Sequence, residues 1–412
     1  MAAVSIADIF EMDAHDPLAP VRDRFQLPEG VIYLDGNSLG ALPRQTPAHV
    51  AHVVESQWGR DLIRSWNRHD WIGMPQRLGA KIAGLIGAQG DEVVACDSTS
   101  VNLFKLLHGA FALSPSRTTI LCERAGFPTD RYMAQSVVDL AGGRGVKAVE
   151  RTQIADAIGE DTAVVLLTHV DYRSGHKLDM AAVNRAAKDK GALVLWDLSH
   201  SAGAIDVDLA ASGADLAVGC GYKYLNGGPG APAFLYVGKE LQERLSSPLP
   251  GWMGHAQPFA FWQGYEPAPG IDRFLCGTPP ILAMAALESG LAQFESVDIG
   301  ALFAKGQALC DLYIDLMQGL SQRHGFALAS PKNPDERGSH ISFAHPEAYA
   351  ICQALISRGV IGDFRTPDLL RMGFTPLYTR YRDVWEAVQI LADIMDSGVW
   401  DDARFSQKQR VT

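Results

Sequence analysis

The stretch that decides the fold is residues 215–224, DLAVGCGYKY, an apolar run that passes through a glycine turn to Lys223. Residues 192–197, ALVLWD, form an earlier apolar run that ends on Asp197, and His200 follows it. Short continuous apolar runs of this kind are typical of buried parallel strands. Open α/β sheets bind their ligands at the carboxyl ends of such strands. We therefore predict that Asp197, His200 and Lys223 lie along one edge of a sheet.

This combination of side chains also indicates a cofactor. A lysine that forms a Schiff base, with an acidic partner for a pyridinium nitrogen, is characteristic of pyridoxal 5′-phosphate (PLP) chemistry. Considered singly, Lys223 also fits a surface lysine after a strand, and Asp197 also fits an ordinary helix cap. Their joint position favours a PLP site.

A cofactor phosphate needs backbone N–H groups and hydroxyls, which the beginning of a helix supplies. Residues 96–102, CDSTSVN, place three hydroxyl side chains in a row between a predicted strand and a predicted helix. Ser and Thr are also favoured as plain helix caps, so the same stretch fits both interpretations. We predict that it holds the phosphate.

Strands separated by helical segments predict βαβ units and a mostly parallel sheet. In the first part of the chain we expect strands at residues 31–35, 92–96, 118–122, 146–149, 164–168, 193–196, 216–219 and 233–237, with helices at 100–112 and 129–140. Residues 45–87 and 281–323 have helical patterns, and residues 251–280 form a long Gly- and Pro-rich loop. Further strands are expected at 326–329, 339–344 and 369–374, with helices at 347–358 and 382–396.

The predicted fold class is therefore α/β, with a large domain around a mostly parallel mixed sheet and a smaller α+β domain at the C-terminus. We expect residues 1–50 to be an extended arm or part of the small domain. Residues 51–285 form the expected large PLP-binding domain, and residues 286–412 the small domain. A chain of 412 residues is long enough for two such domains.

Composition narrows the partners and the compartment. The net charge of −11 argues against nucleic acids and anionic membranes, which require basic patches. Residues 1–10 lack the features of a signal peptide, and no apolar run is long enough to span a bilayer. The six cysteines contain no CxxC pair, and His15, His49 and His52 lack metal-ligand spacing. We expect a cytoplasmic protein with a small-molecule substrate and no metal.

Cys352 raises one alternative chemistry. It follows Lys223 at a separation at which cysteine desulfurases place a catalytic thiol. Residues 350–355, AICQAL, however, fit an amphipathic helix and not a mobile Gly/Ser loop. We therefore interpret Cys352 as a buried structural cysteine.

Five segments resemble one family, kynureninase, in order and over nearly the whole chain. They are YLDGNSLG at 33–40, FPTD at 127–130, DLSH at 197–200, YKYLNGG at 222–228 and RMGFTPLY at 371–378. The first and fourth segments are specific. The Asp-x-x-His element is shared more widely with PLP enzymes of the aminotransferase class V type.

The resemblance implies a fold-type I PLP enzyme that works as a homodimer. It implies hydrolysis of L-kynurenine to anthranilate and L-alanine, a step of tryptophan catabolism in the kynurenine pathway and of NAD biosynthesis. Two alternatives stay open: another class V-like PLP enzyme, namely an aminotransferase or a cysteine desulfurase, or a non-catalytic binding protein with the PLP fold. The presence of Lys223 and Asp197 disfavours the second alternative.

The resemblance also implies roles for individual residues. Lys223 would attach PLP, Asp197 with Asp130 beside it would pair with the ring nitrogen, and Tyr222 would take part in acid–base catalysis. The other cofactor contacts would come from Thr99, Ser100 and Tyr222 at the phosphate with Thr168 nearby, Phe127 on the ring, His200 near the phenolic oxygen, and Trp252 and Thr278 from the second subunit. Thr278 stands where some relatives carry Asn, a difference that bears on the choice of aryl ring. Arg371 would bind the substrate carboxylate, together with Asn37 and Ser38, since a guanidinium binds two oxygens at once.

Overall fold

The larger sheet is built from the apolar runs that the sequence marks as strands. The computed structural model describes residues 5–141, 145–261 and 263–408. In this part of the chain one sheet has the strand order β4 (Val93–Ala95), β10 (Phe234–Val237), β9 (Leu216–Gly219), β8 (Leu193–Asp197), β7 (Thr162–Thr168), β5 (Thr119–Glu123) and β6 (Gly145–Val149). The strands from β9 to β6 are parallel, and β10 is antiparallel to both of its neighbours. The predicted mostly parallel mixed sheet is confirmed.

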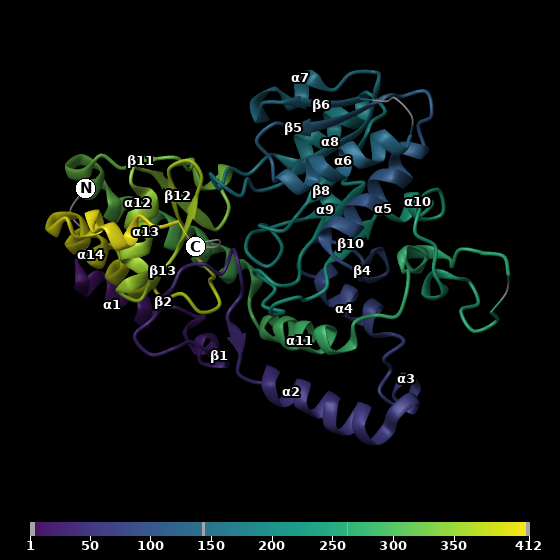
Figure 1. The fold of residues 1–412 in the computed structure, drawn as a ribbon, viewed down its shortest axis with the longest axis horizontal. Coiled ribbons are helices and arrows are strands. Elements are labelled where there is room, and N and C mark those ends of the chain that lie inside the picture. The colour runs from purple at the N-terminus through teal and green to yellow at the C-terminus, as the bar shows by residue number, and fades with distance from the viewer. Residues whose placement is uncertain (1–4, 142–144, 262, 409–412) are drawn as a thin grey trace.

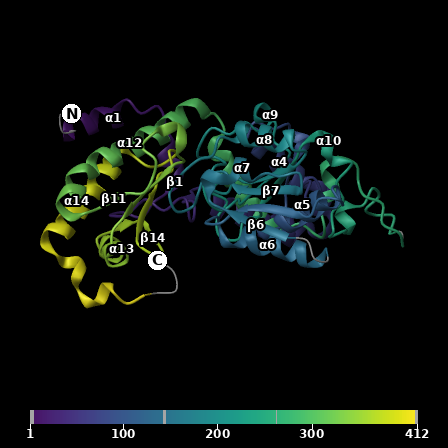
Figure 2. The same ribbon diagram turned by 90° about the horizontal axis from the view of Figure 1, so that it is seen from above.

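Helices cover both faces of this sheet, because its strands are apolar on both faces. Successive strand residues alternate between two hydrophobic cores, as Ile120 and Leu121 do. One core is completed by α5 (Thr99–Ala112) and α6 (Pro128–Leu140), and the other by α4 (Met74–Ala83), α8 (Met180–Asp189) and α11 (Ile281–Leu291). Figure 2 shows α4 and α8 on one side of β6 and β7, and α6 on the other.

A smaller antiparallel sheet lies beside the first unit (Figure 1). Its strand order is β11 (Ala327–Leu328), β12 (His340–Ala344), β15 (Leu369–Gly373) and β14 (Asp363–Arg365). A separate hydrophobic core joins it to α12 (Ile299–His324), α13 (Ala348–Ser357) and α14 (Tyr381–Ser397). The predicted α+β character of the C-terminal part is confirmed.

The N-terminal segment packs with the C-terminal unit. Helix α1 (Ile6–Ala14) lies against α14, and β2 (Ile32–Tyr33) pairs in parallel with β13 (Val360–Ile361). The sequence predicts an extended arm here, but a capping box starts a helix: Ser5 N donates to the Asp8 carboxylate at 2.8 Å, and Asp8 N donates to Ser5 Oγ at 3.3 Å. These contacts favour the grouping of residues 1–50 with the small domain. Residues 1–4 lie outside the described part.

Other helical boundaries also differ from the prediction. The segment 45–87 is divided into α2 (Thr46–His52), which continues as wider turns through Val53–Asp61, and the later helices α3 (Ser65–Arg68) and α4. The segment 281–323 is interrupted between α11 and α12, where Ser296 has a φ of 64°. The predicted boundary at 285/286 falls inside α11, which packs in the core of the larger sheet. The domain boundaries therefore stay predictions.

Among the described residues of the long loop at 251–280 are short 3₁₀ turns at Trp252–Gly254 and Gly270–Phe274 and an isolated bridge between His255 and Pro267. Within the described part of the chain, no helix combines the length and the apolar character that a membrane span requires.

Candidate active site

A cavity of about 270 Å³ opens where the parallel strands end. Its lining comes from segments far apart in the chain, and it gathers most of the cofactor residues that the sequence predicts. The lining residues are Ser98, Thr99, Ser100, Phe127, Thr129, Asp130, Thr168, Tyr172, Asp197, Ser199, His200, Tyr222 and Lys223. The strand-end position is where an open α/β sheet binds ligands.

Lys223 projects from the turn that follows β9. Its Nζ lies 2.9 Å from Nε2 of His200. The turn is held from behind by the N-terminal segment, since Gly40 N donates to the Tyr222 carbonyl at 2.8 Å. A Cβ atom on Gly40 would lie 2.4 Å from the Lys223 carbonyl, so only glycine permits this approach. The segment 36–40, GNSLG, thus packs against the backbone of the turn that carries Lys223.

Asp197 and Asp130 form a pair of buried carboxylates in the cavity wall. Asp197 ends β8 and accepts from the backbone N of Ser199 at 2.8 Å. Asp130 lies in the first turn of α6 and accepts from Thr168 Oγ1 at 3.3 Å. Burial raises the pKa of Asp197, and burial together with repulsion from Asp197 raises that of Asp130 well above its usual value. The Ser199 N–H and the Thr168 hydroxyl are neutral donors, so a cationic N–H group would fit beside these carboxylates.

His200 is buried between the lysine and the smaller sheet. Burial, followed by the nearby Lys223 ammonium, lowers the pKa of His200 well below its ordinary value. The ring is therefore neutral, and its Nε2 can accept from Lys223. Its Nδ1 has no hydrogen-bond partner among the described residues. His200 also lies near His340 of β12, with 5.4 Å between the ring centroids.

The beginning of α5 faces the cavity with its hydroxyl residues. Ser98 is the N-cap, and its Oγ accepts from Val101 N at 3.4 Å. Thr99 and Ser100 are in the first turn and line the cavity. Free N–H groups and the helix dipole make this end suitable for a phosphate. The helix-cap interpretation is confirmed for Ser98, and Thr99 and Ser100 line the cavity, where phosphate binding stays a prediction.

Two predicted cofactor residues lie away from this cavity within one chain. Trp252 lines a separate hollow with His255 and Tyr265, and Thr278 lines another hollow with Gly277. Phe127, by contrast, lines the cavity and makes an edge-to-face contact with Tyr172 at 5.4 Å between centroids. The single chain therefore leaves Trp252 and Thr278 apart from Lys223.

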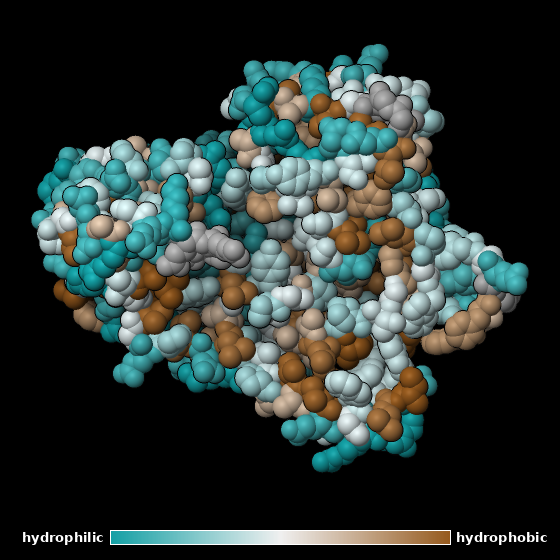
Figure 3. Space-filling model, in the orientation of Figure 1, coloured by the Kyte–Doolittle hydropathy of each residue, from teal (hydrophilic) through white to brown (hydrophobic). Residues whose placement is uncertain are grey.

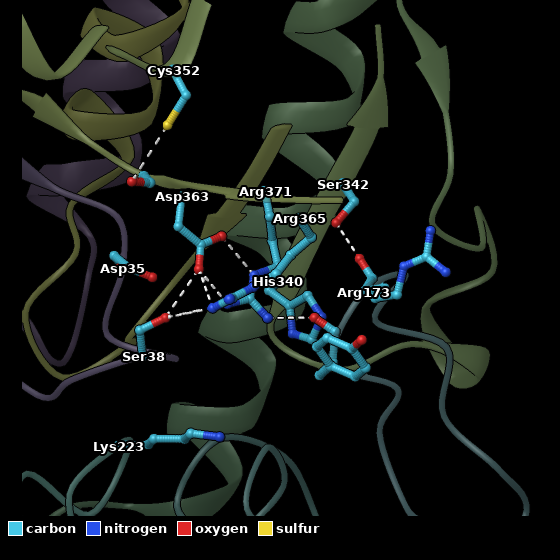
Figure 4. Close-up of polar contacts among 12 residues, drawn as sticks. Asp35, Ser38, Arg173, Lys223, His340, Ser342, Cys352, Asp363, Arg365 and Arg371 are labelled. Carbon is cyan, nitrogen blue, oxygen red and sulfur yellow. Dashed lines mark hydrogen bonds and ion pairs between the residues drawn. The ribbon is translucent and has the colours of Figure 1, made fainter. Parts of the chain in front are cut away.

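The predicted substrate-binding residues meet at the smaller sheet (Figure 4). Arg371 of β15 is 1% exposed, and its Nη2 donates to Ser38 Oγ at 3.2 Å. With its amide oxygen turned toward the guanidinium, Asn37 accepts from Nη2 at 2.9 Å and from Nε at 3.1 Å. Arg371 Nη1 donates to the carbonyl of Tyr172, a cavity-lining residue. The guanidinium thus lies directly behind the cavity wall.

Sequence reasoning missed two neighbours of this group. Tyr172 follows β7 in a loop with no motif to mark it. Asp363 is on β14 and pairs in register with Arg371 of β15. The only local signal for Asp363 is its place in the DFR triplet, three residues that are too short to be identified as a strand.

The fold is that of the fold-type I PLP-dependent enzymes. In structure the chain is similar to a cysteine desulfurase from Thermococcus onnurineus NA1, with a TM-score of 0.78, 19% identity, and coverage of 92% of this chain and 98% of that one. It is also similar to a C-DES variant with glycine covalently linked to its PLP cofactor, with a TM-score of 0.77, 17% identity, and coverage of 90% and 99%. These likenesses show the fold alone.

The chain belongs to the kynureninase family. It is 49% identical to the kynureninase of Pseudomonas fluorescens over 98% of this chain and 99% of the relative. It is 48% identical to that of Burkholderia mallei strain SAVP1 over 97% and 98%. Residues 302–391 match the family model of the kynureninase C-terminal domain. The resemblance read from the sequence motifs is confirmed.

Proposed function

We propose that the protein is a PLP-dependent hydrolase that converts L-kynurenine and water to anthranilate and L-alanine. The observation that carries the proposal is the cavity of the kynureninase-family chain, where Lys223, neutral His200 and the buried Asp197 meet. The reaction cleaves the bond between Cβ and the ketone carbon Cγ, after water has added to Cγ. It would serve tryptophan catabolism and NAD biosynthesis in the cytoplasm.

The residues of the cavity fit PLP. Asp197 supplies a buried carboxylate for the ring nitrogen, with Asp130 beside it, and Phe127 lies where it can contact the ring face. Lys223 would attach the cofactor, His200 would lie near its phenolic oxygen, and Thr99, Ser100, Thr168 and Tyr222 would hold its phosphate end. When bound, PLP supplies an electron sink for the negative charge that develops as the C–C bond breaks.

Proton movements fall to side chains that the structure places around Lys223. Lys223 can carry a proton to and from the substrate α-carbon. Burial raises the pKa of the Tyr222 hydroxyl, so Tyr222 is protonated at neutral pH. Tyr222 is therefore suited to donate a proton or a hydrogen bond, and it is not suited to act as the base that activates water. We assign it the acid part of the cycle.

Arg371 would bind the α-carboxylate of the substrate, with Asn37 and Ser38 completing the contact. The position of its Nη1 behind Tyr172 supports this assignment, because the guanidinium adjoins the cavity. Its full burial means that the charge is held in a place of low dielectric, where a carboxylate contact is stronger than in water.

We further propose a homodimer in which the second copy supplies Trp252 and Thr278 to the cavity. Their separation from Lys223 within one chain supports this arrangement. An apolar surface also favours it, since Figure 3 shows hydrophobic residues near α2 and α11. Leu42 before α2, Trp58, Leu62 and Ile63 after it, and Leu282 in α11 are exposed. Apolar surface of this kind commonly marks an interface.

The test is an absorbance spectrum of the purified protein followed by the addition of L-kynurenine. We expect a yellow protein that releases fluorescent anthranilate together with L-alanine. A protein that instead releases sulfur from cysteine, or transfers an amino group to a keto acid, would contradict the proposal. Cys352 argues against the desulfurase chemistry, since it is fully buried in α13 and its Sγ faces the Gly362 carbonyl at 3.8 Å.

A further inference from the structure

The feature with no role so far is the carboxylate that holds Arg371. Arg371 Nε donates to Asp363 Oδ1 at 2.8 Å, and Nη2 donates to Asp363 Oδ2. The two side chains are each 1% exposed. This pair of parallel bonds along one edge of the guanidinium is the two-pronged contact that fixes an arginine most firmly. Figure 4 shows Asp363 beside Arg371 and Arg365, with Lys223 set apart below them.

These contacts determine which part of Arg371 can meet a ligand. A guanidinium has five N–H donors. Asp363, together with Asn37 and Ser38, occupies the Nε/Nη2 edge, so a substrate carboxylate cannot use that edge while these contacts are made. Nη1 points the other way and contacts the carbonyl of Tyr172 in the cavity wall. The Nη1 end is therefore the end that Asp363 presents to the cavity.

Asp363 is itself held by two further residues. Ser38 Oγ donates to Asp363 Oδ2 at 3.0 Å, and Arg365 Nη2 donates to the same oxygen at 2.6 Å. Burial opposes ionisation of Asp363, but the attraction of Arg371 outweighs it, and the pKa of the carboxyl is lowered overall. Asp363 is thus ionised at neutral pH and balances the buried charge of Arg371.

We propose that Asp363 is the positioning residue for substrate recognition: it fixes the Nε/Nη2 edge of Arg371 so that the Nη1 end faces the α-carboxylate, while Arg365 and Ser38 keep Asp363 in place. This inference rests on the proposed function, because it takes the substrate to be an amino acid that Arg371 binds. Asp363 does not touch the substrate. It acts through the orientation of Arg371.

The test compares Asp363→Asn with the unaltered holoenzyme on two ligands. For L-kynurenine we expect KM to rise about tenfold or more, as for a lost charge-assisted contact, while kcat changes far less. Kynuramine, which lacks the α-carboxylate, is the second ligand, and its inhibition constant should be unchanged. A purely structural role for Asp363 would weaken both ligands together, and that result, or an unchanged KM, would overturn the proposal.

Asp16→Asn is the matched control. Asp16 also forms a buried ion pair, with Lys305 Nζ at 2.7 Å and side-chain exposures of 4% for Lys305 and 2% for Asp16, but it does not line the cavity. We expect this variant to lose stability and to keep the KM of the unaltered enzyme. An equal rise in KM in both variants would show that the loss of any buried pair suffices, which overturns the specific role of Asp363.

Removal of one partner of a buried ion pair strongly destabilises a protein, so Asp363→Asn can fail to fold. A second variant, Arg365→Gln, tests the proposal in that case. Arg365 is partly exposed, with 34% of its side chain accessible, so Arg365→Gln leaves the Arg371 pair in place. We expect a smaller rise in the KM for kynurenine with no change for kynuramine. An unchanged KM in Arg365→Gln would overturn its part in the proposal. Failure of the unaltered enzyme to release anthranilate would instead overturn the proposed function.

Discussion

Asp197 and Asp130 at the edge of the larger sheet, and Asp363 in the smaller one, are all buried carboxylates, but their partners differ. Asp197 and Asp130 accept from a backbone N–H and a threonine hydroxyl, and their pKa values are raised, chiefly by burial. Asp363 accepts from two guanidinium groups, and its pKa is lowered. The donors to Asp197 and Asp130 are neutral, so these carboxylates suit an incoming cation. Asp363 already pairs with two arginines, so its charge is balanced and it can hold the Arg371 side chain in a fixed orientation.

The largest expected effect tests whether the cavity at the edge of the larger sheet, with Asp197 and Asp130 in its wall, holds the cofactor. Lys223→Ala should lower the rate of anthranilate release by at least about 10²–10⁴-fold, since the proposed roles of the residue are to attach PLP and to move the α-proton. Its phosphate contacts should still allow PLP to bind. Borohydride reduction and peptide mass mapping of the unaltered protein should find the pyridoxyl group on Lys223. An adduct on another lysine would contradict the assignment.

The next effect concerns the partner of the ring nitrogen. Asp197→Ala should lower kcat by about ten- to a thousandfold, because the pairing of a carboxylate with a cation shifts a pKa by about one to three units. Single-turnover release of anthranilate measures the loss. A variant with the rate of the unaltered enzyme would show that Asp197 does not supply the charge that keeps the ring protonated.

Arg371→Lys tests the region around Asp363 and should have a more moderate effect. Lysine cannot pair with Asp363 through two parallel bonds and at the same time present a donor where Nη1 lies, so the KM for kynurenine should rise about tenfold or more. The absorbance and the affinity of bound PLP should stay the same, because the proposed contact of Arg371 is to the substrate and not to the cofactor. Loss of PLP from the variant would indicate a different role for Arg371.

The smallest expected effect is on the free energy of unfolding. The contributions of Asp130 and Asp363 to this free energy should change with pH in opposite directions. Asp130 has a raised folded pKa, so its contribution to stability is full below the unfolded pKa of about 3.9 and is lost as the pH rises through the folded value. Asp363 has a lowered folded pKa, so its contribution is present above about pH 3.9 and is lost only as the pH falls through the folded value.

Urea unfolding of the cofactor-free protein between pH 5 and 8 should show this contrast. Asp130→Asn should be more stable than the unaltered protein at pH 8, and the difference should shrink toward pH 5. Asp363→Asn should be less stable by an amount that does not vary over this range. The same sign of change in both variants would contradict the electrostatic distinction between the two regions.

The strands of the larger sheet, and the residues that follow them, could be predicted because each strand is marked by a local apolar run in the sequence. The apolar runs at β8 and β9 are buried on both faces, so strand ends and the residues after them could be read directly. The smaller region depends on pairing between separate segments. Asp363 meets Arg371 only through the register of two neighbouring strands, and β14 is three residues long. Helix α1 was missed because it has a single buried residue, Ile9, and its start depends on a capping box.

The contact between Ser38 and Asp363 has a consequence for how the enzyme is made. The two residues are 325 positions apart, and Ser38 and Arg371 are 333 apart. Domains generally begin to fold from the N-terminus during synthesis, so the larger sheet can form while the ribosome is still adding the last strands. Ser38 in the segment 33–40 can form its contacts with Asp363 and Arg371 only after β14 and β15 have been synthesised. A polypeptide that is cut short before residue 371 would retain the lysine turn but lack the contacts that join it to the substrate-binding side, and it should be recognised by proteases as unfinished.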